Sequence, residues 1–432
     1  MTYISLKSYF FLAGIFLIIN NTLQGMVYDN RYFPFYLKPF VRRCEQSLFL
    51  RFQPMFMRAD RAQGALDDVG LPEIDGHYDQ VDIAQALQVA NIINENPFRS
   101  DFRGLTSIAY KREGRLDAEG IAVFLEQALL PHMWFGASFL FMHVTMRHEF
   151  FLDSRCLPNL PLGDRNYLFS LKGQMHDALG VTPPLYNTTD VADGDVYLRF
   201  GSTWDYMYKF RHIDAGLKIG ALVPLAASRC IDNPASIPLG GNKHWGVYAA
   251  FDIDFEVKED WHAGFLLRFN KRFERTSLQR VPAVMVSVQK PDDQVSMFIA
   301  HEPTGYGAIR GFFGVNPGLT SIFAPYVLLE DIRDGFGFGV QYTLVKHQAD
   351  CFSDKRLIKQ FPEKLDFSEV SNRSGWGAEY VSLTAFYDAS KHHECRWWLP
   401  TIGVSWDMPT DWAISKRVSK THNVSLMLDV RF

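Results

Sequence analysis

Apolar and polar residues alternate with a period of two up to the last residue of the chain. Counting back from Phe432, the apolar positions are Val430, Leu428, Leu426 and Val424, and the positions between them carry Arg, Asp, Met and Ser. This alternation predicts a strand with one apolar face. An exposed terminal strand would be a loose edge in a soluble protein, so the pattern favours a last strand that closes a barrel.

The same alternation recurs in the middle of the chain. It is clearest in residues 196–200, 213–223, 248–257, 262–272 and 336–344, where one face is apolar and the other carries Gly and polar or charged residues. A strand that crosses a bilayer needs about 9–11 residues and an apolar face toward lipid. Its backbone groups must all pair, which requires a closed sheet. The fold class predicted is all-β, an antiparallel transmembrane barrel.

The connections between these segments alternate between short and long. Residues 258–260 and 331–334 form short turns, whereas 148–193, 225–243 and 347–375 are long, which is the asymmetry expected between the two sides of an outer membrane. We predict about twelve strands, with ten or fourteen as alternatives, and short helices in the long loops. The predicted strands are 46–57, 119–129, 135–146, 194–204, 213–224, 245–257, 262–273, 319–330, 335–346, 377–387, 397–406 and 421–432.

The N-terminus has the pattern of a secretory signal peptide. Lys7 precedes an apolar run over 9–19 that ends at two asparagines, and Gly25 is the candidate residue before cleavage. An uncleaved membrane anchor is the alternative, although eleven apolar residues are few for a span. We therefore expect a signal peptide over 1–25, a periplasmic segment over 26–44 and a barrel over 45–432.

With these features the chain resembles the outer-membrane β-barrel proteins of bacteria. In that family the last strand ends in an aromatic residue, usually Phe, after apolar residues at alternate positions. The motif match covers 424–432, and the strand pattern covers most of 45–432. The resemblance implies a location in the bacterial outer membrane, contact with its lipids, and recognition of the C-terminal strand by the barrel-insertion machinery.

Composition supports this class and excludes others. Charged residues make up 21% of the 432 residues, which is not typical of a disordered chain, and a net charge of −4 gives no support for nucleic-acid binding. Aromatic residues reach 15%. Tryptophans near strand ends suggest girdles at the membrane interface, with core packing as the alternative. They are Trp134, Trp204, Trp245, Trp261, Trp376, Trp397, Trp398 and Trp406.

Two of the long loops carry helical patterns. One follows Asp82, a candidate N-cap, and the other covers 166–179. Each could form a plug inside the barrel or pack outside on its own hairpin, and the sequence does not decide between these. The Gly- and Phe-rich stretch 293–318 could also fold inward.

Charged residues on the inner faces offer the main mechanistic clue. The turn at 258–260 places Asp252 roughly opposite Arg268, where cross-strand side chains interact. Opposed charges could act on a solute in a water-filled channel, or they could form salt bridges that fill a narrow barrel. The candidate lumen-lining residues are Arg199, Lys218, Asp252, Asp254, Glu256, Arg268, Asn270 and Arg272.

Cysteines and motifs give no catalytic or metal site. The topology would permit a disulfide between Cys44 and Cys395, or one bridge among Cys156, Cys230 and Cys351. The run 392–395 has metal-capable side chains, but adjacent residues of an extended segment point apart. Because no catalytic motif is present, we expect no enzyme, no cofactor and no metal.

Three functions remain. The first is a porin-like channel for passive passage of small solutes, which the polar and Gly-rich inner faces favour. The second is a plugged structural or adhesive surface barrel without transport. The third and most remote is an outer-membrane hydrolase. The sequence does not decide the oligomeric state.

Overall fold

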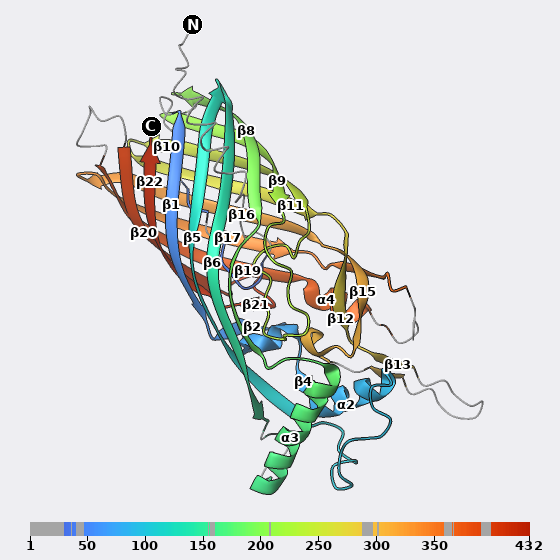
Figure 1. The fold of residues 1–432 in the computed structure, drawn as a ribbon. Coiled ribbons are helices and arrows are strands. Elements are labelled where there is room, and N and C mark those ends of the chain that lie inside the picture. Colours follow the sequence, from blue (N-terminus) through green and yellow to red (C-terminus); the bar gives the residue numbers. More distant parts are fainter. Residues whose placement is uncertain are drawn as a thin grey trace.

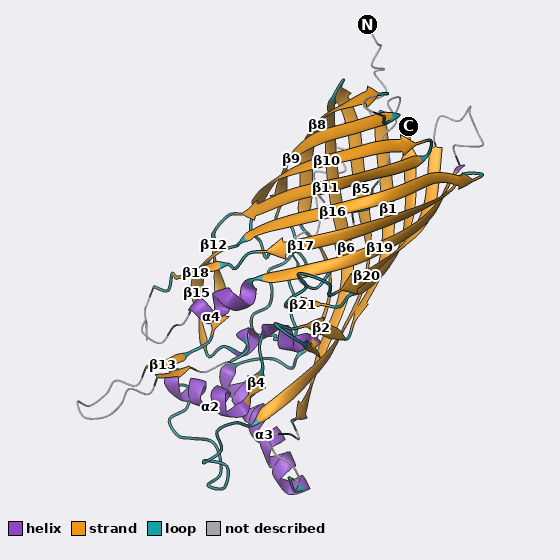
Figure 2. Ribbon diagram, turned by 180° about the vertical axis from the view of Figure 1, so that it is seen from behind, coloured by secondary structure: helices purple, strands orange, loops and turns teal. Residues whose placement is uncertain are grey.

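The computed structural model forms a closed antiparallel β-barrel (Figures 1 and 2). It describes residues 30–35, 37–39, 47–153, 155, 160–206, 209–286, 297–299, 302–357, 365, 367–389 and 399–432. Twelve strands in this described part make up the barrel. They are β1 (Leu48–Ala59), β5 (Ala109–Leu130), β6 (Met133–Leu152), β8 (Gly194–Asp205), β9 (His212–Val223), β10 (Gly246–Lys258), β11 (Trp261–Arg272), β16 (Leu319–Arg333), β17 (Phe336–His347), β19 (Trp376–Asp388), β20 (Leu399–Thr410) and β22 (His422–Arg431).

The ring closes through the first and last strands. β1 pairs with β5 on one side and with β22 on the other, and β5 also pairs with β6, which completes the circle. At this seam the Phe432 N–H donates to the Leu48 carbonyl at 3.0 Å, and the Ser47 N–H donates to the Phe432 carbonyl at 3.0 Å. The predicted role of the C-terminal strand in closing the sheet therefore agrees with the observed pairing.

Each of the twelve predicted segments overlaps one barrel strand. The largest differences lie in β5 and β6, which extend about ten and six residues beyond the predicted limits of 119 and 146. In these extensions most outward positions carry charges, with Phe151 as an apolar exception, so the regular apolar alternation stops while hydrogen bonding continues. The pattern therefore marked the apolar part of the hairpin and not its full length.

An apolar belt surrounds the outer face. On β22, Val424, Leu426 and Leu428 are 44%, 52% and 39% exposed, whereas the residues between them are buried inside. A water-soluble protein rarely leaves so large an apolar surface uncovered. Other large outward residues are Phe52, Phe56, Ile121, Phe141, Leu198, Phe200, Leu217, Ile219, Val247, Phe251, Phe269, Phe323, Val327, Phe338, Val340, Ile402 and Val404.

The belt ends at one level on neighbouring strands. On β5 the outward residues change from Ile121 to Glu119, and on β6 they change from Phe141 to His143. Glu119 and His143 are partners across the β5–β6 pair, so the change falls on one line. Such an edge is expected where a lipid phase gives way to water.

A cap lies at the end of the barrel away from Phe432 (Figures 1 and 2). We call that end the cap end and the opposite one the terminal end. The elements outside the barrel ring are β2 (Arg61–Gln63), β3 (Asp68–Gly70), η1 (Leu71–Asp75), β4 (Tyr78–Asp79), α2 (Gln80–Val89), α3 (Leu162–Leu179), β7 (Leu185–Val191), β12 (Arg275–Val281), β13 (Val284–Val286), β14 (Met297–Ile299), η2 (Thr304–Tyr306), β15 (Ile309–Asn316), β18 (Cys351–Asp354), α4 (Phe367–Ser374) and β21 (Val418–Ser419).

The cap has a hydrophobic core of its own, which combines α2, α3 and loop residues with the extended ends of β5 and β6. Tyr78 is fully buried at its centre. Its ring meets Phe150 edge-on at 5.1 Å and Tyr306 edge-on at 5.2 Å, and its hydroxyl lies 2.9 Å from His176 Nε2. The long β5–β6 hairpin thus serves as a wall on which the cap folds.

The two predicted loop helices exist and belong to this cap. The N-cap of α2 is Asp79, which accepts from the Val81 N–H at 2.8 Å, and not the predicted Asp82. The α2 and α3 helices are joined by a hydrogen bond from Gln80 to the Leu168 carbonyl at 3.1 Å. They pack over the end of the barrel together, so neither a plug deep in the barrel nor separate packing outside describes them. In the stretch 293–318, the described part contributes β14, η2 and β15, which are cap elements.

The N-terminal segment differs from its predicted periplasmic location. Its described residues, 30–35 and 37–39, lie inside the barrel, and we call them the luminal segment. Lys38 is 3% exposed, and its ammonium group contacts Ser382 and Asp407 on the inner face. The Tyr32 carbonyl accepts from Thr421, just before β22. Burial of Tyr32, Phe33 and Phe35 favours this location over the periplasm, because in water these aromatic side chains would be exposed.

The tryptophans form only part of a girdle. Exposed on the outer surface are Trp204, Trp245, Trp261 and Trp406. Trp134 and Trp376 instead point inward, because Trp134 lies under the Arg199 guanidinium at 5.0 Å and Trp376 is stacked on His347. In the described part of the chain, no helix combines the length and the apolar character that a membrane span requires.

Several predictions fall outside the described residues. They are the signal peptide over 1–25, the thiols of Cys44, Cys156 and Cys395, the run 392–395, and Trp397 and Trp398. Cys230 and Cys351 are described, and both carry exposed free thiols, so no bridge joins these two.

Candidate functional site: the barrel interior

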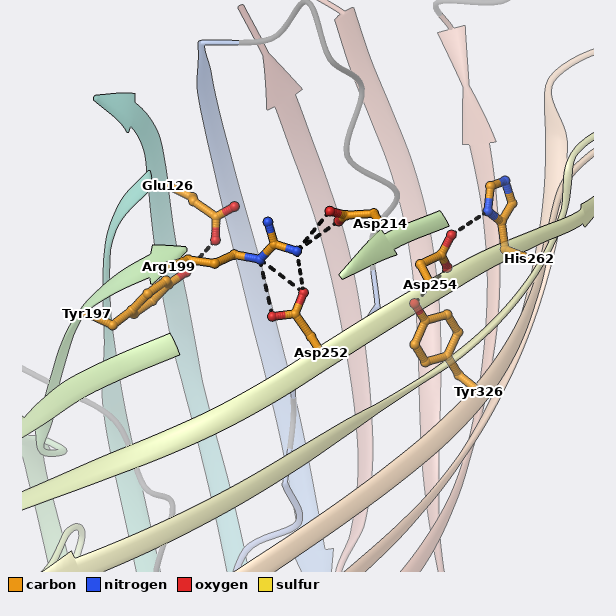
Figure 3. Close-up of polar contacts among 8 residues, drawn as sticks. All are labelled: Glu126, Tyr197, Arg199, Asp214, Asp252, Asp254, His262 and Tyr326. Carbon is orange, nitrogen blue, oxygen red and sulfur yellow. Dashed lines mark hydrogen bonds and ion pairs between the residues drawn. The ribbon is translucent and has the colours of Figure 1, made fainter. Parts of the chain in front are cut away.

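A buried ionic cluster lies on the inner wall formed by β8, β9 and β10 (Figure 3). Arg199 is fully buried and donates to Asp214 at 3.0 Å and to Asp252 at 2.8 Å. The three side chains meet because successive residues of a strand point to opposite faces, and all three occupy inward positions on neighbouring strands. Two carboxylates thus face one guanidinium, and Trp134 covers its face.

The predicted pair of Asp252 and Arg268 is wrong by two residues. Asp252 faces Leu266, and Arg268 faces Ala250. The hairpin turn is tight, because Lys258 pairs with Trp261. A register shift between Glu256 and Lys258 then fixes which residues of β10 and β11 face each other farther from the turn. Arg268 turns to another wall residue instead and donates to Asp195 at 3.1 Å.

The remaining predicted lumen residues also point inward. Asp254 accepts from the Tyr326 hydroxyl at 2.7 Å and lies 2.7 Å from His262 Nδ1 (Figure 3). Arg268 stacks 3.5 Å over the Tyr248 ring, and its Nε donates to Asn270 at 2.7 Å.

Three further predicted residues are spread along the same wall. The Lys218 ammonium lies 5.0 Å from the Tyr197 ring centre, and the Tyr197 hydroxyl in turn donates to Glu126 at 2.8 Å (Figure 3). Glu256 lies 3.8 Å from Arg211 near the terminal end. Arg272 pairs with Asp193 at 2.7 Å.

The opposite inner wall has an apolar stretch in its middle part, between the cap and the residues Arg51 and Glu126 toward the terminal end. On β1, β5 and β6 the inward side chains include Met55, Ala122 and Leu140, all fully buried. They belong to one buried cluster with Tyr32 and Phe33 of the luminal segment. The barrel interior therefore combines the ionic cluster on β8, β9 and β10 with an apolar cluster that includes the aromatic residues of the luminal segment.

Inside the barrel, charged contacts fix the luminal segment at Lys38. Arg51 makes a two-pronged contact with Asp429, at 2.7 Å for both hydrogen bonds, and donates to the Lys38 carbonyl at 3.0 Å. Lys38 in turn pairs with Asp407. Charge-assisted hydrogen bonds of this kind are directional, so they set the position of the segment along the barrel.

Asp75 of η1 organises the cap end. It pairs with Arg31 and lies 3.4 Å from Arg229, and its carbonyl accepts from Arg373 at 3.1 Å. Burial alone would raise the pKa of Asp75, but the nearby arginines, Arg31 foremost, lower it to about 2. The carboxylate therefore stays ionised and joins the luminal segment to the cap.

Sequence reasoning missed the acids that pair with the predicted basic residues. Asp193 and Asp195 flank the start of β8, and Asp214 and Asp407 occupy inward positions. Asp214 lies on the polar face of a segment that clearly alternates, which is a usable signal. Asp193 precedes its strand and carries no periodic signal. Among the described residues, no group of three His, Cys, Asp or Glu side chains is arranged to hold a metal ion.

Glu302 gives the cap a pH dependence. It is fully buried and accepts from the Ala283 and Ala308 N–H groups. Burial raises the pKa of Glu302 to about 8, although these hydrogen bonds act to lower it. Its folded pKa lies above its unfolded value, so its stabilisation is present at acid pH and is lost as pH rises toward 8.

We expect the melting temperature of the wild-type protein, relative to that of Glu302→Gln, to fall between pH 5 and pH 8. Glutamine cannot ionise, so the difference isolates Glu302 from other titrating groups. Scanning calorimetry at several pH values would measure it. A difference that stays constant across this range would contradict the assignment.

Comparison with known proteins gives only distant structural likeness. No protein-family model matches the sequence, and no curated protein sequence matches it significantly. An outer-membrane channel from Pseudomonas putida F1 is 8% identical with a TM-score of 0.46, covering 91% of this chain and 100% of that one. The toluene transporter TodX of Pseudomonas putida is 10% identical with a TM-score of 0.33, covering 90% of each chain.

An autotransporter transport unit shows a similar degree of likeness. This domain, from AIDA-I of Escherichia coli, is 6% identical with a TM-score of 0.34 and covers 92% of this chain and 93% of its own. All three are barrels with different tasks, and scores at this level assign no function. What this chain does has to be inferred from its own interior.

Proposed function

We propose that this protein is an outer-membrane channel for small solutes, with no enzymatic role. The proposal rests on the contrast between the two faces of the barrel sheet. The outer face carries the apolar belt, and the inner face is lined by Arg199, Asp252, Arg268 and their partners. Lipid accounts for the apolar outside, and the paired charges on the inside would line a path for polar solutes once the luminal segment shifts. In this arrangement the cap faces the cell exterior and the terminal end faces the periplasm.

The luminal segment restricts passage in the structure. It is held by ionic contacts of Arg31 at the cap end and of Lys38 farther inside the barrel, where Asp407 of β20 is the partner. The segment is not a strand of the barrel sheet, so it can shift without unfolding the sheet, because the barrel strands keep their own hydrogen bonds. The proposal therefore includes a channel whose open fraction depends on these contacts.

Planar-bilayer recording of the refolded full chain tests this function. We expect discrete conductance steps from the wild-type protein and a larger open fraction from Lys38→Met, which loses the contact with Asp407. Lys258→Met is the matched control, since Lys258 is exposed at the end of β10. If pure wild-type and Lys38→Met proteins both fail to conduct, the channel function is wrong.

A plugged surface barrel without transport is the second candidate. The specific observation in its favour is the cap, whose separate core includes Leu87, Leu168 and Phe313 at full burial. A rigid cap over a filled lumen would leave the exposed loops as the functional surface. If neither the wild-type protein nor Lys38→Met conducts in the bilayer while both remain folded, this candidate is favoured over the channel.

A further inference from the structure

An arginine-lined cavity lies where the luminal segment, η1, the loop before β10 and α4 meet at the cap end. Its volume is about 220 Å³. Pockets for drug-sized ligands usually measure about 300–1,000 Å³, so an occupant would be a small solute. Five arginines line it: Arg31, Arg229, Arg272, Arg280 and Arg373.

Three of these arginines are oriented by acids that do not line the cavity. Arg272 pairs with Asp193 at 2.7 Å, Arg280 with Asp232 at 2.7 Å, and Arg373 with Glu369 at 2.7 Å. The arginines line the cavity and these three acids do not, so the lining has more positive than negative side chains. Fixed guanidinium groups in a partly desolvated space attract anions more strongly than mobile ones in water.

The other two arginines share one carboxylate. Arg31 contacts Asp75 closely, whereas Arg229 lies 3.4 Å from the same side chain, with 21% of its own side chain exposed. Asp350, which also lines the cavity, lies 2.9 Å from His347 Nε2 and accepts from the Gly318 N–H. Two guanidinium groups thus meet one carboxylate at the cavity wall, and Arg229 is the less tightly engaged.

The remaining wall can hold the body of a solute. Trp376 and Tyr32 line the cavity, and the Trp376 ring is stacked on His347 with centroids 5.7 Å apart and planes at 19°. Flat aromatic walls beside charged groups suit a compact organic body that carries an anionic group.

We propose that this cavity is a binding site for a small organic anion, with Arg229 and Arg31 recognising its carboxylate or phosphate group. This inference rests on the proposed function, and it names the class of solute that the channel takes up. Guanidinium groups bind both anions through paired hydrogen bonds, so the shared chemistry is a planar or tetrahedral oxyanion. The site lies at the cap end of the barrel, where it would select solutes before they enter the lumen.

Isothermal titration calorimetry on the detergent-solubilised full chain tests the site without requiring conductance. The probes are glucuronate, inorganic phosphate and, as an uncharged comparison, glucose. We expect glucuronate or phosphate to bind and glucose not to bind. Arg229→Gln should weaken binding by about tenfold or more, the size expected for loss of a charge-assisted hydrogen bond.

Two control variants separate binding from folding. Arg165→Gln removes an exposed arginine on α3, outside the cavity, and should bind as the wild type does. Arg229→Lys keeps the charge and should restore part of the affinity. Binding of glucuronate, of phosphate, or of both would support the site.

Two results would overturn the site. They are failure of both anions to bind the wild-type chain, or equal affinity of Arg229→Gln when its melting temperature is unchanged. Binding by a chain that is silent in the bilayer would instead remove the channel function while leaving the anion site in place.

Discussion

Replacing Arg199 with Met is expected to lower the free energy of unfolding by about 3–5 kcal/mol, the usual cost of breaking a buried ion pair on one side. The reason is that Asp214 and Asp252 would remain inside the barrel without their shared guanidinium. Urea unfolding in lipid vesicles, followed by tryptophan fluorescence, would measure the change. The effect belongs to uncompensated charge and not to lost packing, since Met fills much of the same space.

Two controls test that explanation. Lys218→Met, on the neighbouring strand, should cost much less, because Lys218 is only partly buried and lies beside an aromatic ring. Adding Asp214→Asn and Asp252→Asn to Arg199→Met should recover part of the loss, because the stranded charges are gone. A triple variant as unstable as the single one would show that the cluster does not act through charge.

Replacing Leu426 with Arg is expected to destabilise the barrel by about 2–4 kcal/mol, the cost of an arginine at the middle of a bilayer. Leu426 is 52% exposed near the centre of the apolar belt on β22. The same vesicle-based unfolding experiment would measure the loss. This result tests directly whether lipid, and not water, surrounds the outer surface.

His422→Arg is the matched control for depth. His422 is on the same outward face of β22 but lies at the belt edge, where arginine costs only about 0–1 kcal/mol. Equal and small effects at positions 422 and 426 would mean that the belt does not face a membrane.

The barrel could be predicted because lipid imposes a strict alternation on every strand. Outward Leu428 and Leu426 and inward Asp429 and Ser425 follow from one period-two pattern, and burial confirms these orientations. The register of β10 against β11 was not predictable to the residue, because one shift at Glu256 and Lys258 changes every later partner. The alternation shows which residues lie on the inner face, and the geometry of the turn decides which of them are cross-strand partners.

The luminal segment and the cap were beyond pattern analysis for a different reason. Tyr32, Phe33 and Phe35 follow no regular period, since an extended segment inside a barrel meets walls on all sides. Charged residues such as Glu113 and Arg147 alternate with buried ones on the extended hairpin, where water has replaced lipid. The position of such segments is set by tertiary contacts. In the sequence they are visible only as aromatic residues that belong to no predicted strand or helix.

The pairing of β1 with β22 has a consequence for assembly. The luminal segment precedes β1 in the chain. It contacts Arg51 of β1 on one side of that junction, and Asp407 of β20 and Thr421 on the other. Once the junction has zipped up, the chain could reach those contacts only by threading through the completed ring, and folding chains rarely thread. The segment must therefore be enclosed as the ring forms, so docking of the segment comes before, or together with, the final zipping step.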